Sequence, residues 1–192
     1  MMTLGIVVED QRDANVYSAL IKKIRPDVDV VLERPCGGVA AVRRGFVGWL
    51  KNFEWHAGYQ VVKALIIRDC DRLEPREAED ELARILQQSG FRPSFPVHFY
   101  ATRREMETWL LADEGAVNLV ARRRQKGPAA QVVAGSLEDI PDAKEKFRRM
   151  LSQARLPADP AVYGEIATAS DLNRINGRCP YFQQFVNRVR AC

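Results

Sequence analysis

The strongest constraint on the fold is an alternation of short buried strands with amphipathic helices over the first 115 residues. Four short runs rich in apolar and β-branched residues are typical of strands buried on both faces. They are LGIVVE (4–9), VDVVLE (28–33), VVKALIIRD (61–69) and FPVHFYA (95–101). Each is followed by a segment with helical spacing of its apolar residues; these segments are 10–26, 34–53, 76–90 and 103–113. This succession predicts a parallel sheet with helices on both faces.

The remainder of the chain lacks strand patterns and predicts helices. Residues 121–141 contain several Gly and Pro residues and are expected to form mainly loop. Segments 142–154 and 180–190 carry apolar residues at helical spacing. We therefore expect an α/β core over residues 1–115, with about four parallel strands, and a C-terminal helical appendage over residues 116–192 packed on that core.

Composition excludes several kinds of site. The four cysteines show no CxxC spacing and the two histidines are far apart, which argues against a disulfide framework, a zinc site and a Ser-His-Asp triad. No apolar run approaches the roughly 18 residues of a membrane-spanning helix, and the first residues lack the pattern of a signal peptide. The expectation is a soluble, cytoplasmic protein with no membrane partner.

Positive charge is concentrated in the appendage. Residues 116–192 carry 13 Lys and Arg against 7 Asp and Glu, whereas residues 1–115 carry 16 against 18. Such a distribution suits contact with a phosphate backbone. A solvated arginine-rich surface explains it equally well.

Acidic residues end two of the predicted strands. Glu9 closes the first strand, and Asp69 and Asp71 close the third within LIIRDCDR (65–72). Ligands of such sheets bind beyond the carboxyl ends of the strands, and side chains at i and i+2 of an extended segment point to the same side. Carboxylates gathered there suit Mg²⁺. In the alternative, Asp71 caps the next helix and Asp69 pairs with a neighbouring arginine at 68 or 72.

Glu107 lies on the apolar face of the predicted helix 103–113. Met106, Trp109, Leu110 and Leu111 define that face. A carboxylate that points inward needs a cation or hydrogen bonds. Glu107 is therefore either part of the acidic site or the partner of a structural arginine such as Arg68.

The acids and several other motifs together resemble a known family. A glutamate at the first strand end and a DxD at a later one resemble the TOPRIM fold of topoisomerases, bacterial primases and overcoming-lysogenization-defect (OLD) nucleases. More closely, GIVVED, CGG, LIIRDCDR, METWLLAD and the final IATASDLNRINGRCPYFQQFV look like an uncharacterised bacterial family with a TOPRIM-like domain, domain of unknown function 4276.

This resemblance implies a role for each acid. Glu9 matches the TOPRIM glutamate, implicated as general base or acid, while Asp69 and Asp71 match the metal-binding pair. Glu107 matches the acid of the family's tryptophan-containing helix. The residue after the first glutamate is commonly glycine in this group and is Asp10 here, a bulkier and charged neighbour that changes the approach of a phosphate or adds a ligand. Asp10 and Asp13 are interpreted as loop and helix-cap residues.

The predicted function is a Mg²⁺- or Mn²⁺-dependent nuclease of the phage-defence or mobile-element kind. Its predicted substrate is nucleic acid, DNA rather than RNA, and TOPRIM-like nucleases of this kind often work beside an ATPase. Six basic residues are predicted to contact substrate phosphates: Arg103, Arg104, Arg122, Arg123, Arg124 and Lys126. The alternatives are a non-catalytic subunit that binds nucleic acid or a partner protein, and an enzyme acting on a small nucleotide.

Overall fold

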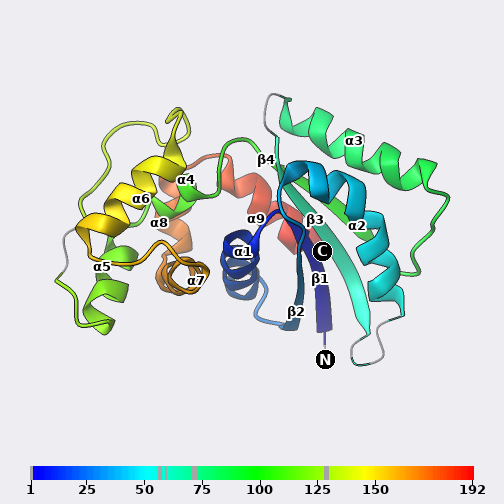
Figure 1. Cartoon of the computed structure of the whole chain (residues 1–192), viewed down its shortest axis with the longest axis horizontal. Helices are drawn as coiled ribbons and strands as arrows, with labels where there is room; N and C mark the ends of the chain where they lie inside the picture. Colours follow the sequence, from blue (N-terminus) through cyan, green and yellow to red (C-terminus); the bar gives the residue numbers. More distant parts are fainter. Residues whose placement is uncertain (1, 56–57, 59, 71–72, 128–129) are drawn as a thin grey trace.

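The computed structural model describes residues 2–55, 58, 60–70, 73–127 and 130–192. Four strands form one sheet in the order β2-β1-β3-β4, and each neighbouring pair is parallel. The strands are β1 (Met2–Val8), β2 (Val28–Pro35), β3 (Val61–Asp69) and β4 (Val97–Thr102). All four were predicted from the sequence, and the expected α/β architecture, a parallel sheet of four strands flanked by helices, is confirmed (Figure 1).

Helices follow the strands and then fill the C-terminal part of the chain. They are α1 (Gln11–Ile24), α2 (Val39–Glu54), α3 (Pro75–Gln88), α4 (Glu107–Leu110), α5 (Glu114–Arg123), α6 (Ala143–Gln153), α7 (Pro160–Ala169), α8 (Leu172–Arg178) and α9 (Phe182–Ala191). None of the helices in the described ranges combines the length and apolarity that a membrane crossing requires.

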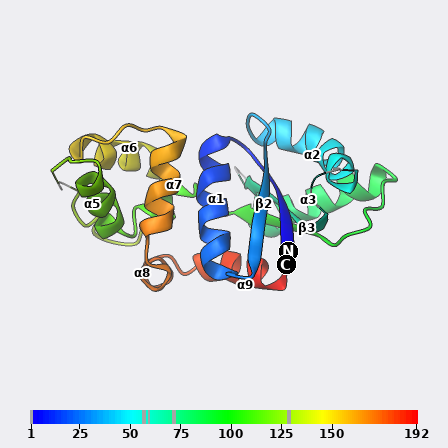
Figure 2. The same ribbon diagram turned by 90° about the horizontal axis from the view of Figure 1, so that it is seen from below.

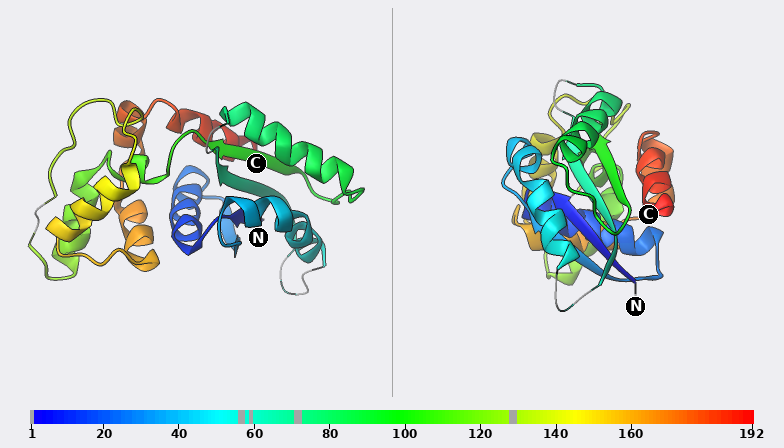
Figure 3. Two further views of the ribbon diagram at one scale, coloured as in Figure 1. Left: turned by 45° about the horizontal axis from the view of Figure 1, so that its top comes forward. Right: turned by 90° about the vertical axis from the view of Figure 1, so that its right-hand side faces the viewer.

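The two faces of the sheet are covered by different helices. The chain moves from β1 to β2 in one direction and from β2 past β1 to β3 in the other, so right-handed crossovers place α1 and α2 on opposite faces. One hydrophobic core joins β1, β3 and β4 to α1 and α9, and a second joins β1 and β3 to α2 and α3. The last helix therefore returns to complete the layer begun by the first (Figure 3).

Helices α5, α6, α7 and α8 form a lobe beside the sheet, and α7 packs along α1 (Figure 2). The first core runs without interruption from Leu65 in β3 to Phe147 in α6 and Tyr163 in α7. The proposed division into residues 1–115 and 116–192 follows a change in sequence pattern, and the two segments share one hydrophobic core. Its boundary also falls within α5.

One prediction about local structure was wrong. The helix expected over residues 103–113 is only four residues long, because Asp113 is the N-cap of α5 and its side chain accepts the Ala116 N–H at 3.2 Å. The amide groups of Ala112 and Asp113 bond three residues back, to Trp109 and Leu110, as in a tight terminal turn. The segment 121–141 is mainly loop in its described residues, as expected, although its first three residues end helix α5.

Candidate functional site

The site forms at the carboxyl ends of β1 and β3, which are neighbours in the sheet. Here the chain order reverses, which is where open α/β sheets bind ligands. Glu9 directly follows β1, and Asp69 is the last residue of β3. The Glu9 carboxylate accepts the backbone N–H of Asp69, with 2.6 Å between N and Oε1. The structure thus brings together two predicted acids that are sixty residues apart in sequence.

The loop after β2 holds the backbone of Glu9. The N–H groups of Gly37 and Gly38 donate to the Glu9 carbonyl oxygen at 2.6 and 2.9 Å. Both glycines have positive φ angles, 96° and 103°, which a residue with a Cβ rarely adopts. Gly38 is also the N-cap of α2, as expected for a turn into that helix. The CGG segment therefore fixes the position of Glu9.

Helix α1 begins with a capping box made of two acids. Asp10 is the N-cap, and its carboxylate accepts the N–H groups of Arg12 at 2.7 Å and Asp13 at 3.1 Å. The Asp13 carboxylate accepts the Asp10 N–H at 3.2 Å. The sequence had suggested Asp13 as the cap; the cap is Asp10, and Asp13 is the third residue of the helix. This geometry turns the Asp13 carboxylate back toward the ends of the strands.

Asp13 belongs electrostatically to the acidic site, which the sequence analysis missed. Burial, followed by the charges of Asp10, Glu9 and Glu107, raises the pKa of Asp13 to about 8. Burial and then the charges of Glu9 and Asp13 raise the pKa of Asp69 well above its usual value. The position of Asp13 in the sequence was the signal that could have identified it. A residue four places after Glu9 lies in the first turn of a helix that starts at this edge of the sheet.

Glu107 faces inward, as predicted, and is 3% exposed. Burial raises its pKa, while the Lys144 ammonium group acts in the opposite direction. Glu107 in turn raises the pKa of both Asp13 and Asp69. Glu9, Asp13, Asp69 and Glu107 therefore interact as one acidic cluster.

Arg68 lies on the α3 side of the sheet. Its guanidinium group binds Glu81 of α3 at 2.7 Å, and its Nε donates to the Asp69 carbonyl oxygen at 2.9 Å. Consecutive side chains of a strand point to opposite faces, so Arg68 points away from the side chain of Asp69. This buried arginine braces the backbone of Asp69.

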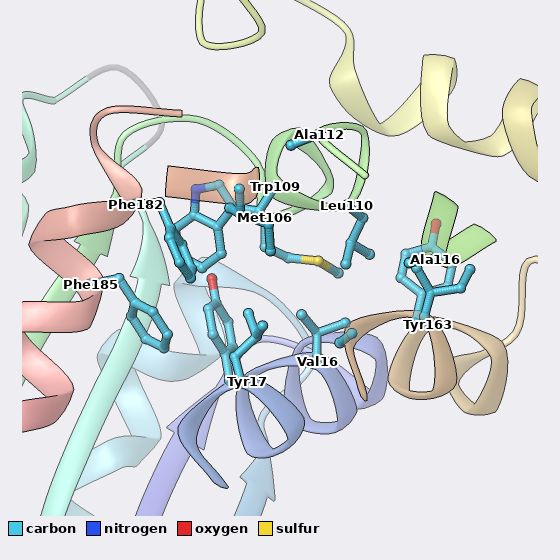
Figure 4. Close-up of a cluster of buried hydrophobic side chains, with 14 of the residues drawn as sticks. Val16, Tyr17, Met106, Trp109, Leu110, Ala112, Ala116, Tyr163, Phe182 and Phe185 are labelled. Atoms are coloured by element: carbon cyan, nitrogen blue, oxygen red, sulfur yellow. The ribbon is translucent and has the colours of Figure 1, made fainter. Parts of the chain in front are cut away.

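An aromatic cluster fixes the short helix that carries Glu107. Figure 4 shows Trp109 of α4 between Tyr17 of α1 and two phenylalanines of α9. The Trp109 ring centre lies 5.9 Å from that of Tyr17 and 5.0 Å from those of Phe182 and Phe185. Ring contacts of this kind add to the hydrophobic stabilisation of a core. The C-terminal helix thereby helps to position Glu107 beside the ends of the strands.

The donor set suits a hard divalent cation. Carboxylate oxygens are the protein ligands that Mg²⁺ prefers, commonly one or two together with water and phosphate oxygens. The raised pKa values of Asp13, Asp69 and Glu107 show that burial and mutual repulsion disfavour the charged carboxylates. A bound cation would favour their charged forms. Within the ranges that the structure describes, no three Asp, Glu, His or Cys side chains are arranged as a metal site. Asp71 lies outside the described residues.

The predicted phosphate contacts lie in two separate places. Arg103 and Arg104 follow β4 and line a small pocket there, with the Arg103 guanidinium carbon 4.1 Å from the ring centre of Tyr181. The others lie at the C-terminal end of α5, a helix that packs against α7 (Figures 1 and 2). There, Arg124 pairs with Glu165 at 2.6 Å, while residues 122, 123 and 126 are exposed.

Comparison with known proteins identifies a family and a fold. The sequence profile of a family described as "Domain of unknown function (DUF4276)" matches residues 9–190. None of the curated proteins matches the chain.

Two solved structures are similar across nearly the whole chain. The C-terminal region of the Xanthomonas campestris pv. campestris OLD protein is 11% identical, with a TM-score of 0.50, and the match covers 98% of this chain and 94% of that one. The C-terminal region of the Burkholderia pseudomallei OLD protein is 13% identical, with a TM-score of 0.44, and the coverages are 95% and 98%. At this identity, the first likeness shows a shared fold.

Proposed function

The chain belongs to the DUF4276 family, and from that premise we propose that it is a divalent-metal-dependent phosphodiesterase that cleaves nucleic acid. The observation that carries the proposal is the contact between Glu9 and Asp69 at the switch point of the sheet. Two acids from distant segments meet at the edge where ligands of this sheet class bind. Asp13 and Glu107 add two further carboxyl groups at the same place.

Each acid has a proposed role. Asp69 and Glu107, together with Asp71, would hold Mg²⁺ or Mn²⁺, and Asp13 stands beside them. A bound divalent cation supplies positive charge against a phosphodiester and lowers the pKa of water. Glu9, in contact with the Asp69 backbone, would accept or return the proton of the attacking water. The substrate proposed is DNA, held in part by Arg103 and Arg104 at the end of β4.

The test is cleavage of DNA by the purified protein in Mg²⁺ or Mn²⁺. We expect supercoiled plasmid to be nicked and Asp69→Asn, which keeps the shape of the side chain, to abolish nicking. The matched control is Asp80→Asn, which removes an exposed acid from α3. If Asp69→Asn nicks DNA at the same rate as Asp80→Asn, the acidic cluster takes no part in cleavage.

The second candidate function is that of a non-catalytic binding subunit. It is favoured because some of these acids have structural roles as helix caps and hydrogen-bond acceptors. Asp10 and Asp13 cap α1, and Glu9 accepts the Asp69 amide. Calorimetric titration with Mn²⁺ separates the two candidates. Persistent DNA binding with a steep salt dependence, without any binding of Mn²⁺, would favour the binding subunit.

A further inference from the structure

Arg12 lies next to the acidic cluster and is held against the helical lobe. It belongs to the first turn of α1, three residues after Glu9. Its guanidinium carbon is 5.7 Å from the ring centre of Tyr163, a fully buried residue of α7. Helices α1 and α7 pack side by side (Figure 2). The buried Tyr163 ring therefore forms a fixed surface beside the Arg12 guanidinium group.

One buried polar atom at this contact, Nε of Arg12, has no hydrogen-bond partner among the described residues. The carboxylate paired with Arg12 is that of Asp10, at 3.6 Å, and it already accepts two amide groups as the cap of α1. Buried polar groups in proteins are nearly always hydrogen-bonded, so an unpaired N–H on a guanidinium group calls for an acceptor.

The surroundings indicate which acceptor fits. Burial, the charge of Glu107 and the opposing charges of Arg12 and Arg148 set the pKa of Tyr163 at about 12. Arg148 of α6 is exposed, and its side chain interacts with the Tyr163 hydroxyl. Two arginines from different helices therefore approach the same tyrosine. A small anion is the group that such a pair attracts.

We propose that Arg12 binds a phosphate oxygen of the substrate beside the acidic cluster, with the Tyr163 ring holding its guanidinium group in place. This inference rests on the proposed function. A phosphodiester that approaches Glu9, Asp69 and Glu107 is repelled by their charges, and a guanidinium group fixed nearby offsets part of that repulsion. The planar fork of guanidinium N–H groups matches phosphate oxygens, and the Arg12 side chain is 28% exposed, so its Nη–H groups can donate to a phosphate that approaches from solvent.

The test measures binding and cleavage separately. Fluorescence anisotropy with a short fluorescein-labelled DNA duplex in Ca²⁺ gives the affinity, and nicking in Mg²⁺ gives kcat and KM. We expect Arg12→Gln to weaken binding about tenfold, because a charge-assisted hydrogen bond is lost. Arg12→Lys, which keeps the charge without the fork, should fall between Arg12→Gln and the wild type. The matched control is Arg149→Gln, which replaces an exposed arginine of α6 that pairs with Glu145 at 3.6 Å.

The outcomes distinguish this inference from the proposed function. Thermal unfolding first shows whether Arg12→Gln and Arg149→Gln are folded. If both are folded and have the same affinity and the same nicking rate, the role of Arg12 is overturned, while the proposed function is not affected. Binding that depends on Arg12 without any nicking by the wild type would overturn the proposed catalysis and leave the phosphate contact standing. If Arg12→Gln does not fold, Arg12→Lys decides: affinity equal to the wild type contradicts the inference.

Discussion

Replacing Asp13 by Asn should stabilise the metal-free protein at high pH and leave it unchanged at low pH. The amide oxygen of Asn can still accept the Asp10 N–H, so the capping box is kept while the charge is removed. The pKa of Asp13 in the folded protein is about 8, against 3.8 for an unperturbed aspartate, chiefly because of burial and the charge of Asp10.

The sign follows from the protons bound in each state. Between pH 4 and pH 8 the folded protein holds a proton on Asp13 that the unfolded chain has released, so the stability of the wild type falls as the pH rises. At about 1.4 kcal/mol per unit, the full shift corresponds to an upper limit of roughly 6 kcal/mol. The pKa values of Asp69 and Glu107 are raised as well, by burial first and then by neighbouring carboxylates, so the repulsion is shared among several groups. We therefore expect about half of this limit, roughly 3 kcal/mol, for Asp13→Asn at pH 8.

Urea unfolding in EDTA from pH 4 to pH 8 measures the effect directly. The difference in free energy of unfolding between Asp13→Asn and the wild type should be near zero at pH 4 and grow with pH. Added Mg²⁺ should narrow the difference at pH 8, since a bound cation relieves the same repulsion. Parallel pH profiles for the two proteins would refute the reasoning, because Asp13 would then not interact with the cluster.

Three further substitutions test the parts that position the site. Gly5→Ala places a Cβ 2.6 Å from the Phe53 ring, so the free energy of unfolding measured in urea should fall by about 1–3 kcal/mol. Glu81→Ala removes a partner of the buried Arg68, and the same measurement should show a loss of about 3–5 kcal/mol; a loss below about 1 kcal/mol would contradict the bracing role. Trp109→Ala opens the aromatic cluster under α4 and should lower stability by about 3–5 kcal/mol and abolish nicking.

The sheet could be predicted from the sequence because its strands carry their own signal. A strand buried on both faces must be apolar along its length, and β3 (Val61–Asp69) has this pattern with an acid at its end. The secondary structure after residue 103 was harder to predict from the sequence. Residues 106–113 are all buried, so their apolar pattern suited a long helix, while the cap at Asp113 ended it early.

The acids of the site divide in the same way. Glu9 and Asp69 were found because a strand end has a defined place in a parallel sheet. Asp13 was missed because a capping residue and a site residue look alike in sequence, and the difference lies in the contact of α1 with the strand ends. The pairing of Arg12 with Tyr163 depends on the packing of α7 along α1, which no local pattern encodes.

The most direct test of the central claim is the anomalous density of Mn²⁺ in crystals of the protein. We predict a peak at the ends of β1 and β3, bonded at about 2.1 Å to a carboxylate oxygen of Asp69 and lost in Asp69→Asn. Mn²⁺ bound elsewhere at full occupancy, with no peak beside Asp69 and Glu9, would contradict the assignment of this acidic cluster as a metal centre.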